Sequence, residues 1–335
     1  MFKQAFKRYK IKTESPDLQD VIDLDQYEAI NFDSGCHNLE LVQPAIVPEI
    51  QISPSLRVPV GLQSPNDWRC YTLANHPGLL VIRNPFTPTG QRYWIARSLR
   101  DYPQAPNYVN LDAKHFSVNA VSNWWGELHQ SGHKTVDQRL KTAMRWTTLG
   151  YHHNWDTKVY DEAKHTTFPS DLSSLCQYFS LVLGYQHFIP QAAIVNYYPI
   201  GTTLSGHTDH SELNLAAPLF SLSFGQTAIF LIGGMTLEEQ PTALYLRSGD
   251  VLVMSEKSRL CYHAVPRVMK THKKSWNGNS KEMHEDPFNT SMDSELYDQV
   301  KDEDFWMPFE GYINDSRINI NVRQVLPSDV SQIHI

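Results

Sequence analysis

The chain has 335 residues, of which 41% are hydrophobic and 19% are charged, a composition that excludes fibrous and intrinsically disordered proteins. It contains no run of about 18 apolar residues, so no membrane-spanning helix is predicted. The formal net charge of −7 excludes a uniformly basic nucleic-acid coat, although basic residues gather at 3–12 and at 267–281. The four cysteines form no Cys-x-x-Cys pair, which predicts a reduced, intracellular setting.

Residues 1–75 predict a basic arm that leads into an extended segment. Aromatic residues recur at helical spacing among the lysines at the start of the chain, and an acidic helix is expected over 17–27. Residues 46–75 are rich in proline and serine and are expected to form loops. The lysine-rich start resembles the remnant of a targeting signal, so we expect the protein in the nucleus, the mitochondrion or the cytoplasm.

Residues 76–190 predict a helical region. The expected elements are a buried strand at 78–82, a helix over 90–101 with Thr87 as its cap, and a helix over 172–183 capped by Ser170 and Asp171. Between the two helices, residues 103–168 are rich in aromatic side chains but have no clear periodicity. No regular element is therefore predicted there.

From residue 191 the hydrophobic period changes to two, which predicts strands through the segment 191–335. The expected strands are 194–198, 220–232, 243–246, 251–254, 259–265 and 317–325. Short strands with tight turns after an α-rich half favour a β-core of jelly-roll type. The polar segment at about 267–316 interrupts these strands and is expected to be a surface insertion.

A candidate metal site lies in this strand region. Residues i and i+2 of a strand point to the same face, so His207 and Asp209 can contact one ion, and His263 can add a third ligand from another strand. Two imidazoles and one carboxylate form the facial triad of iron(II) oxygenases, which leaves coordination positions open for a cosubstrate and O₂. Taken alone, the His-x-Asp pair is a weak signal, and two surface polar residues in a turn are the alternative interpretation.

The segment 317–323 alternates strictly between polar and apolar residues. The residues that share the polar face of this predicted strand are Arg317, Asn319, Asn321 and Arg323. Two arginines that face a β-core beside an iron site require an anion, and a dicarboxylate would supply one, because a guanidinium matches a carboxylate in two hydrogen bonds. Asn196 and Tyr198 share a face in the same way and offer neutral donors. An ordinary half-exposed strand is the alternative explanation.

Together these motifs resemble the ordered signature of the AlkB family. The matching segments are 146–151, 196–201, His207-Thr208-Asp209 with Glu212, then His263, and 317–323. The similarity runs from about residue 144 to residue 324 and is greatest to the eukaryotic homolog-one branch of the family. It implies an α+β fold with a double-stranded β-helix (jelly-roll) as the catalytic core and an α-rich N-terminal half.

The resemblance implies Fe(II) and 2-oxoglutarate as cofactors, with O₂ as cosubstrate. His207, Asp209 and His263 would hold the iron, and Arg317 would complete the catalytic set by binding the distal carboxylate of 2-oxoglutarate. The residues that would help to bind this acid are Asn196, Tyr198, Asn319 and, near the inner carboxylate, Arg323. The alternation at 317–323, rather than the long spacing after His263, supports these assignments.

The resemblance also implies a lid over the target base in the second segment of the chain. Trp146 and Tyr151 would stack on the base or enclose it, and Arg145 would meet a phosphate. Ser211 and Glu212 would complete the substrate contacts. The chain departs from the family at Ser211, because the family position carries a carboxylate that accepts from an exocyclic amino group, which serine does more weakly.

The implied function is oxidative demethylation or hydroxylation of methylated bases by a monomeric enzyme. A base inside a duplex cannot reach a buried iron, so the target must be unpaired or flipped. tRNA that carries 1-methyladenine or 5-methylcytosine is the favoured substrate, and 6-methyladenine in unpaired DNA is a further candidate. A protein demethylase or hydroxylase with the same iron site is the main alternative; a non-catalytic nucleic-acid-binding module and an abasic-site lyase are weaker ones.

Overall fold

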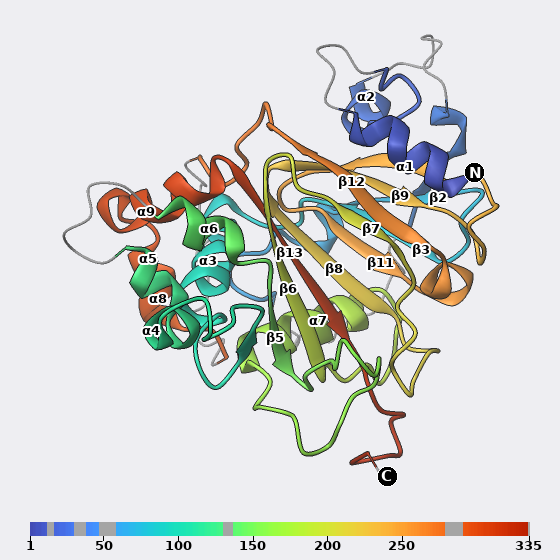
Figure 1. Cartoon of the computed structure of the whole chain (residues 1–335). Helices are drawn as coiled ribbons and strands as arrows, with labels where there is room; N and C mark the ends of the chain where they lie inside the picture. Colours follow the sequence, from blue (N-terminus) through green and yellow to red (C-terminus); the bar gives the residue numbers. More distant parts are fainter. Residues whose placement is uncertain (12–16, 30–37, 47–57, 130–136, 279–290, 334–335) are drawn as a thin grey trace.

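The computed structural model describes residues 1–11, 17–29, 38–46, 58–129, 137–278 and 291–333. Two antiparallel sheets form the centre of this part of the chain (Figure 1). The larger sheet has nine strands in the order β1-β2-β3-β11-β8-β13-β6-β5-β4, and the smaller has four in the order β10-β9-β12-β7. The predicted α+β fold with a jelly-roll core is confirmed.

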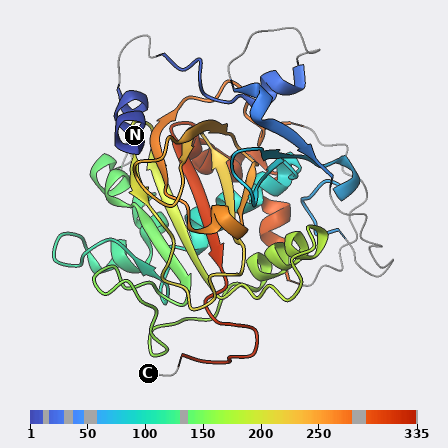
Figure 2. The ribbon, with the colours of Figure 1, turned by 90° about the vertical axis from the view of Figure 1, so that its right-hand side faces the viewer.

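The strands of the larger sheet are β1 (Val42–Ala45), β2 (Arg69–Leu73), β3 (Leu79–Arg83), β4 (Tyr108–Val109), β5 (Trp146–Gly150), β6 (Ala192–Pro199), β8 (Leu219–Gly225), β11 (Val251–Met254) and β13 (Ser316–Arg323). Those of the smaller sheet are β7 (Leu204–His207), β9 (Thr227–Ile232), β10 (Thr242–Leu246) and β12 (His263–Met269). Figure 2 shows β13, in red, running through the middle of the molecule. Its central place matters because it carries both candidate arginines.

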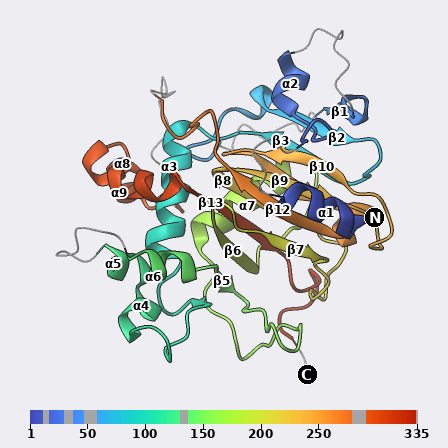
Figure 3. The same cartoon turned by 45° about the horizontal axis from the view of Figure 1, so that its top comes forward.

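The helices of the described residues are α1 (Phe2–Lys10), α2 (Leu24–Ala29), α3 (Pro88–Ala96), α4 (Val118–Ser122), α5 (Trp124–Leu128), α6 (Gln138–Ala143), α7 (Ser170–Val182), α8 (Ser294–Gln299) and α9 (Glu303–Ile313). α3, α8 and α9 lie side by side at one edge of the molecule, whereas α1 crosses β7 and β12 of the smaller sheet (Figure 3). Within the described residues, no helix has the length and apolar character needed to cross a membrane.

The apolar run at 220–232 forms two strands rather than the single strand predicted. The chain breaks at Gly225, whose φ is +85°, and a Cβ atom there would lie 2.6 Å from the carbonyl oxygen of Ser316. Before the break β8 pairs with β11 and β13 of the larger sheet; after it β9 pairs with β10 and β12 of the smaller one. Both strands are buried, so the apolar pattern of the sequence continues through Gly225. The sequence therefore does not show where the chain crosses from the larger sheet to the smaller one.

The two helices predicted in the α-rich half are present, with one difference at their caps. The Thr87 hydroxyl accepts from the backbone N–H of Gly90 at 3.1 Å, as predicted, and α3 continues into a π-helical turn at Arg97–Asp101. α7 instead begins at Ser170, without a side-chain cap. The Asp171 carboxylate accepts hydrogen bonds from the Tyr93 hydroxyl and the Arg97 guanidinium in the interior. It therefore links α7 to α3 instead of capping α7.

The expected surface insertion at 267–316 is partly wrong. Strand β12 extends to Met269, and α8 and α9 follow after residues 279–290, which lie outside the described part of the chain. Trp276 and Trp306 are fully buried, and the Arg92 guanidinium lies 5.0 Å from the ring of Trp306. The polar composition of the segment conceals an apolar face that packs on α3. Likewise, the strand expected at 259–265 begins only at His263.

The predicted basic arm begins with helix α1, which packs against the core of the protein. Its side chains Phe2, Ala5 and Tyr9 are buried against the smaller sheet, which leaves its lysines exposed. The acidic helix expected over 17–27 begins only at Leu24. The expected loop segment 46–75 contains a further strand, β2, which pairs with β1 and β3. Residues 12–16, 30–37 and 47–57 of this region lie outside the described residues.

Candidate active site

The three predicted metal ligands come together at one end of the smaller sheet. His207 is the last residue of β7, His263 is the first residue of β12, and the two are direct partners in the strand pairing. Asp209 lies beyond the end of β7, not on the strand as predicted, yet its carboxylate oxygens are 4.0 Å from His207 Nε2 and 3.8 Å from His263 Nε2. One ligand atom from each residue lies within 4.8 Å of the others.

The protonation states of this trio fit a divalent metal. Burial lowers the pKa of His263 to about 4, so its imidazole is neutral at pH 7, as metal ligation requires. Burial alone would raise the pKa of Asp209, but Arg323, His263 and His207 together hold it well below its usual range. The donor set is therefore two imidazoles and one ionised carboxylate, which matches the facial triad of iron(II) oxygenases.

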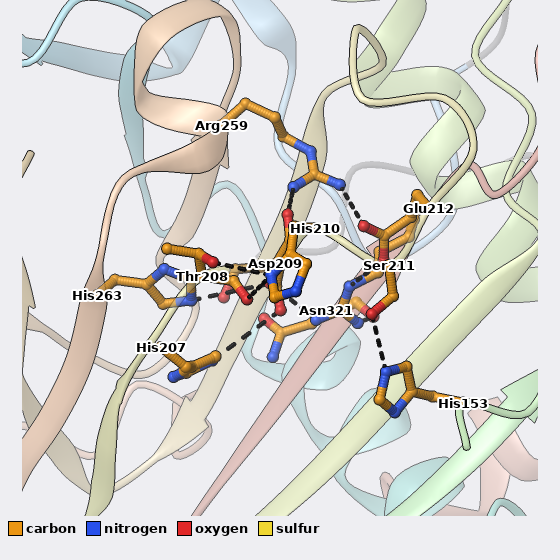
Figure 4. Close-up of polar contacts among 12 residues, drawn as sticks. His153, His207, Thr208, Asp209, His210, Ser211, Glu212, Arg259, His263 and Asn321 are labelled. Atoms are coloured by element: carbon orange, nitrogen blue, oxygen red, sulfur yellow. Dashed lines mark hydrogen bonds and ion pairs between the residues drawn. The ribbon is translucent and has the colours of Figure 1, made fainter. Parts of the chain in front are cut away.

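A buried charge network holds Asp209 in place (Figure 4). Arg323 Nη2 donates to the Asp209 carboxylate at 2.9 Å, and Arg259 Nη1 donates to the Asp209 backbone carbonyl at 2.7 Å. Glu212 lies between the two arginines, 2.9 Å from Arg259 Nη2 and 3.2 Å from Arg323 Nε, and also accepts from the Tyr160 hydroxyl. Such second contacts orient a ligand and tune the metal.

This network adds ion pairs to two residues expected at the site. Arg323, expected near the inner carboxylate and the substrate pocket, and Glu212, expected beside the substrate, both line the cavity in front of the metal ligands and are both ion-paired within the fold. Arg259 was not identified from the sequence. It was placed in a predicted strand at 259–265, whereas it lies in a short 3₁₀ helix at 256–260 and its side chain is 2% exposed. A buried arginine requires a paired acid, and only the fold shows which one.

Arg317 is equally buried but forms no ion pair with an acid in the described part of the chain. It is 1% exposed; its Nη2 donates to Ser223 Oγ at 2.9 Å, while Nε and Nη1 have no hydrogen-bond partner among the described residues. Burial lowers the pKa of Arg317 to about 10. Unsatisfied N–H donors on a buried guanidinium fit a bound carboxylate that accepts from them. The residues present therefore fit the distal carboxylate of 2-oxoglutarate.

The predicted helpers of Arg317 surround it on β6 and β13. Tyr198 pairs with Arg317 across the strands, its ring lies 5.5 Å from the guanidinium, and its buried hydroxyl has no partner in the described structure. Burial raises the pKa of Tyr198 to about 12, so the hydroxyl stays protonated and can donate. Asn319 pairs with Asn196, and its amide already donates to Ser221 and Leu222, which fixes its orientation.

The sequence model of the 2OG-Fe(II) oxygenase superfamily matches residues 78–323, a range that includes all three metal ligands and Arg317. The chain belongs to this superfamily. It is therefore a dioxygenase whose cofactors are Fe(II) and 2-oxoglutarate, and His207, Asp209 and His263 form its candidate iron site.

Named relatives place this dioxygenase in the AlkB family. It is 40% identical to "Nucleic acid dioxygenase ALKBH1" of Mus musculus, over 80% of this chain and 69% of that protein. It is 30% identical to "DNA N(6)-methyladenine demethylase ALKBH1A" of Arabidopsis thaliana, over 97% of this chain and 95% of that protein. It is 29% identical to "tRNA demethylase abh1" of Schizosaccharomyces pombe, over 98% of this chain and 96% of that protein. The family resemblance seen in the motifs is confirmed.

A solved structure, "The structure of OsALKBH1", superposes with a TM-score of 0.44 at 17% sequence identity, over 74% of this chain and 97% of that chain.

A cavity of about 580 Å³ opens in front of the dioxygenase's metal ligands. The residues that line it from outside the iron and arginine motifs include His153, Trp155, Lys158, Tyr160, Ser211 and Tyr262. Trp155 is 39% exposed and supplies an aromatic face, and the Lys158 ammonium lies 5.7 Å from its ring. The cavity thus combines an aromatic wall with a positive charge at its edge.

The structure revises the expected lid. Ser211 lines the cavity as predicted, but Trp146 packs against Trp155 with ring centroids 5.2 Å apart, and Trp155 forms the cavity wall. Tyr151 is buried away from the cavity, and its hydroxyl donates to Glu162 at 2.7 Å. These aromatic residues fall in the aperiodic segment 103–168, so no pattern in the sequence could assign their directions.

Arg145 remains a candidate substrate contact. Its side chain is half-buried, and its Nε has no hydrogen-bond partner in the described structure. Its backbone N–H donates to Asn110 Oδ1 at 2.6 Å, and its carbonyl accepts from Tyr197. The backbone of Arg145 is thus fixed beside β6, while its Nε can still donate a hydrogen bond.

Proposed function

We propose that this dioxygenase oxidises methylated bases in unpaired or structured nucleic acid, removing methyl groups on nitrogen as formaldehyde and hydroxylating those on carbon. tRNA that carries 1-methyladenine or 5-methylcytosine is the first candidate substrate, and 6-methyladenine in unpaired DNA is the next. The observation that carries the proposal is the cavity itself, with Trp155 on its wall and Lys158 at its edge, opening onto His207 and Asp209 of the three-residue metal site. The relatives named for activity on DNA and tRNA support the same substrate class.

The size and lining of the cavity favour a single extruded base. Its volume of about 580 Å³ suits a small-molecule ligand. A base within a duplex cannot enter such a space without leaving the stack. Trp155 can stack on a base of any identity, because every base offers a π-face. Lys158 supplies positive charge for a phosphate of the flanking backbone.

The protein's own residues act by holding and orienting. Bound Fe(II), with 2-oxoglutarate and O₂, supplies the oxidation of the methyl group. His207, Asp209 and His263 would hold the metal. Arg317 and Tyr198 would bind the distal carboxylate of the acid. The Arg259–Glu212–Arg323 network keeps Asp209 ionised and in place.

The test is succinate and formaldehyde formation on a tRNA stem-loop that carries 1-methyladenine, with Fe(II) and 2-oxoglutarate. The unmethylated stem-loop and a peptide with methylated lysine serve as controls. We expect turnover only with the methylated RNA, and its loss in Asp209→Ala and Arg317→Ala. Turnover of the peptide in preference to RNA, and to single-stranded DNA with 6-methyladenine, would contradict the proposal and favour a protein substrate.

A further inference from the structure

His153 and Ser211 form a hydrogen-bonded pair in the cavity wall (Figure 4). His153 Nε2 lies 3.0 Å from Ser211 Oγ. The imidazole packs against two aromatic rings, with centroid distances of 4.7 Å to Trp155 and 5.5 Å to Tyr160, and both contacts are edge-on. These two contacts and the hydrogen bond to Ser211 orient the ring before any substrate binds.

The pair carries no charge at neutral pH. Burial, followed by the positive charges of Arg323 and Lys158, lowers the pKa of His153 to about 4. Glu212 and Asp209 act in the opposite direction, but each is paired with an arginine. They are also the only acids among the described residues that line the cavity. Near Ser211, therefore, no unpaired carboxylate faces the cavity.

The surroundings of the ring select its tautomer. His153 Nδ1 is buried and has no hydrogen-bond partner among the described residues. A buried N–H without an acceptor is rarer and more costly than a buried acceptor without a donor, so the proton belongs on Nε2. Nε2 then donates to Ser211 Oγ, and the serine hydroxyl is left with its own proton to donate. Ser211 thereby becomes a donor toward the cavity.

We infer that His153 is a specificity-determining residue, which orients Ser211 to donate a hydrogen bond to an acceptor atom of the target base. This inference rests on the proposed function and names the chemistry of the base it selects. A carboxylate at this position would accept from an amino group and favour a cationic base. The His153–Ser211 pair instead donates to a ring nitrogen or carbonyl oxygen of the base. Because the pair is neutral, it does not favour binding of a cationic base over a neutral one.

The test compares binding of two single-stranded oligonucleotides of one sequence, one with 6-methyladenine, which is neutral, and one with cationic 1-methyladenine. Fluorescence anisotropy is measured with Mn(II) in place of iron and with 2-oxoglutarate, so nothing turns over. In Ser211→Asp we expect the ratio of the two affinities to shift about tenfold toward 1-methyladenine, because the new carboxylate attracts the cation. An unchanged ratio would overturn the inference.

His153 is tested by variants of graded chemistry. His153→Phe keeps the aromatic packing but loses the donor, so we expect about fivefold weaker binding of both methylated oligonucleotides. His153→Gln restores an N–H donor and should recover most of that loss. His152→Phe is the matched control, since His152 is stacked on Tyr108 at 4.0 Å and lies outside the cavity lining. It should bind both like the wild type.

The outcomes separate this inference from the proposed function. If the wild type prefers the methylated oligonucleotides over unmethylated ones, and His153→Phe keeps the same affinities, the role of His153 is wrong while the proposed function stands. If the wild type shows no preference for methylated over unmethylated oligonucleotides, the proposed function and this inference fail together.

Discussion

Arg317 and Arg323 lie near the two ends of strand β13, on the same face, and neither is more than 3% exposed. Arg323 contacts two carboxylates, those of Asp209 and Glu212, and these charges raise its pKa. Among the described residues Arg317 contacts no carboxylate: its one hydrogen bond there goes to the Ser223 hydroxyl, and burial lowers its pKa to about 10. One strand thus presents two buried arginines in opposite electrostatic states.

This difference in ion pairing indicates a different role for each arginine. A buried guanidinium is costly unless an anion compensates it. Arg323 has its anions within the fold, so it stabilises the folded chain and the ligand Asp209. Arg317 lacks one, so its compensation must come from a bound acid. The same residue type on one face of the strand is ion-paired within the fold at one end and, as we propose, binds the cosubstrate at the other.

The largest expected effect follows from removing the unpaired arginine. Arg317→Met should weaken 2-oxoglutarate binding by about 4 kcal/mol, roughly 1,000-fold in dissociation constant, because the ligand carboxylate loses its buried charged partner. The free energy of unfolding of the ligand-free protein should stay within about 1 kcal/mol of the wild type or rise, since an uncompensated buried charge is gone. Anaerobic calorimetric titration and urea unfolding measure the two quantities.

A matched variant sharpens this result. Ser223→Ala removes the single hydrogen bond that orients the guanidinium but leaves its charge. We expect about a fivefold loss of 2-oxoglutarate affinity. Equal losses in both variants would mean that orientation rather than charge binds the acid.

The paired arginine should behave in the reverse way. Arg323→Met leaves the carboxylates of Asp209 and Glu212 buried, and Glu212 keeps only Arg259 as an ionic partner. We expect the free energy of unfolding of the metal-free protein to fall by about 3 kcal/mol. Urea unfolding beside Arg317→Met tests the contrast directly. If the two variants are destabilised equally, the division of roles between the arginines is wrong.

Much of this arrangement could be predicted from the sequence because strands have a period of two. The alternation at 317–323 places both arginines on one face, and the pairing of β13 with β6 then brings Tyr198 beside Arg317. The same period put His207 and Asp209 on one face, although Asp209 lies beyond the end of β7, while His263 was assigned as a ligand from another strand rather than by the period. Periodicity cannot show which of the two arginines forms ion pairs within the fold, since Asp209 and Glu212 lie in the irregular segment after β7.

The remaining differences arise where contacts are long-range or irregular. Trp155, rather than Tyr151, forms the cavity wall because the loop after β5 folds back, and nothing in its aperiodic sequence fixes that path. The crossover at Gly225 is hidden within a continuous apolar run. The aromatic residues of α9 face inward although the surrounding segment is polar. In each case tertiary packing decides the outcome.

The smallest expected effect concerns unfolding at low pH, and it again distinguishes Arg323 from Arg317. Arg323, with His263 and His207, holds the pKa of Asp209 well below its usual range. A carboxyl whose pKa is lowered in the folded state contributes stability above its unfolded pKa of about 3.9, and loses that contribution as the pH falls toward the folded value. In Arg323→Met the folded pKa of Asp209 rises and this contribution shrinks, so unfolding of the metal-free protein should begin about one pH unit higher. His263, with a folded pKa of about 4, adds a loss of stability between pH 6.5 and 4, and this loss shrinks slightly in Arg323→Met because the charge of Arg323 helps to lower that pKa. Circular dichroism from pH 7 to pH 3 should therefore show an upward shift of the acid midpoint in Arg323→Met and none in Arg317→Met, whereas coincident midpoints would mean that Arg323 does not control Asp209.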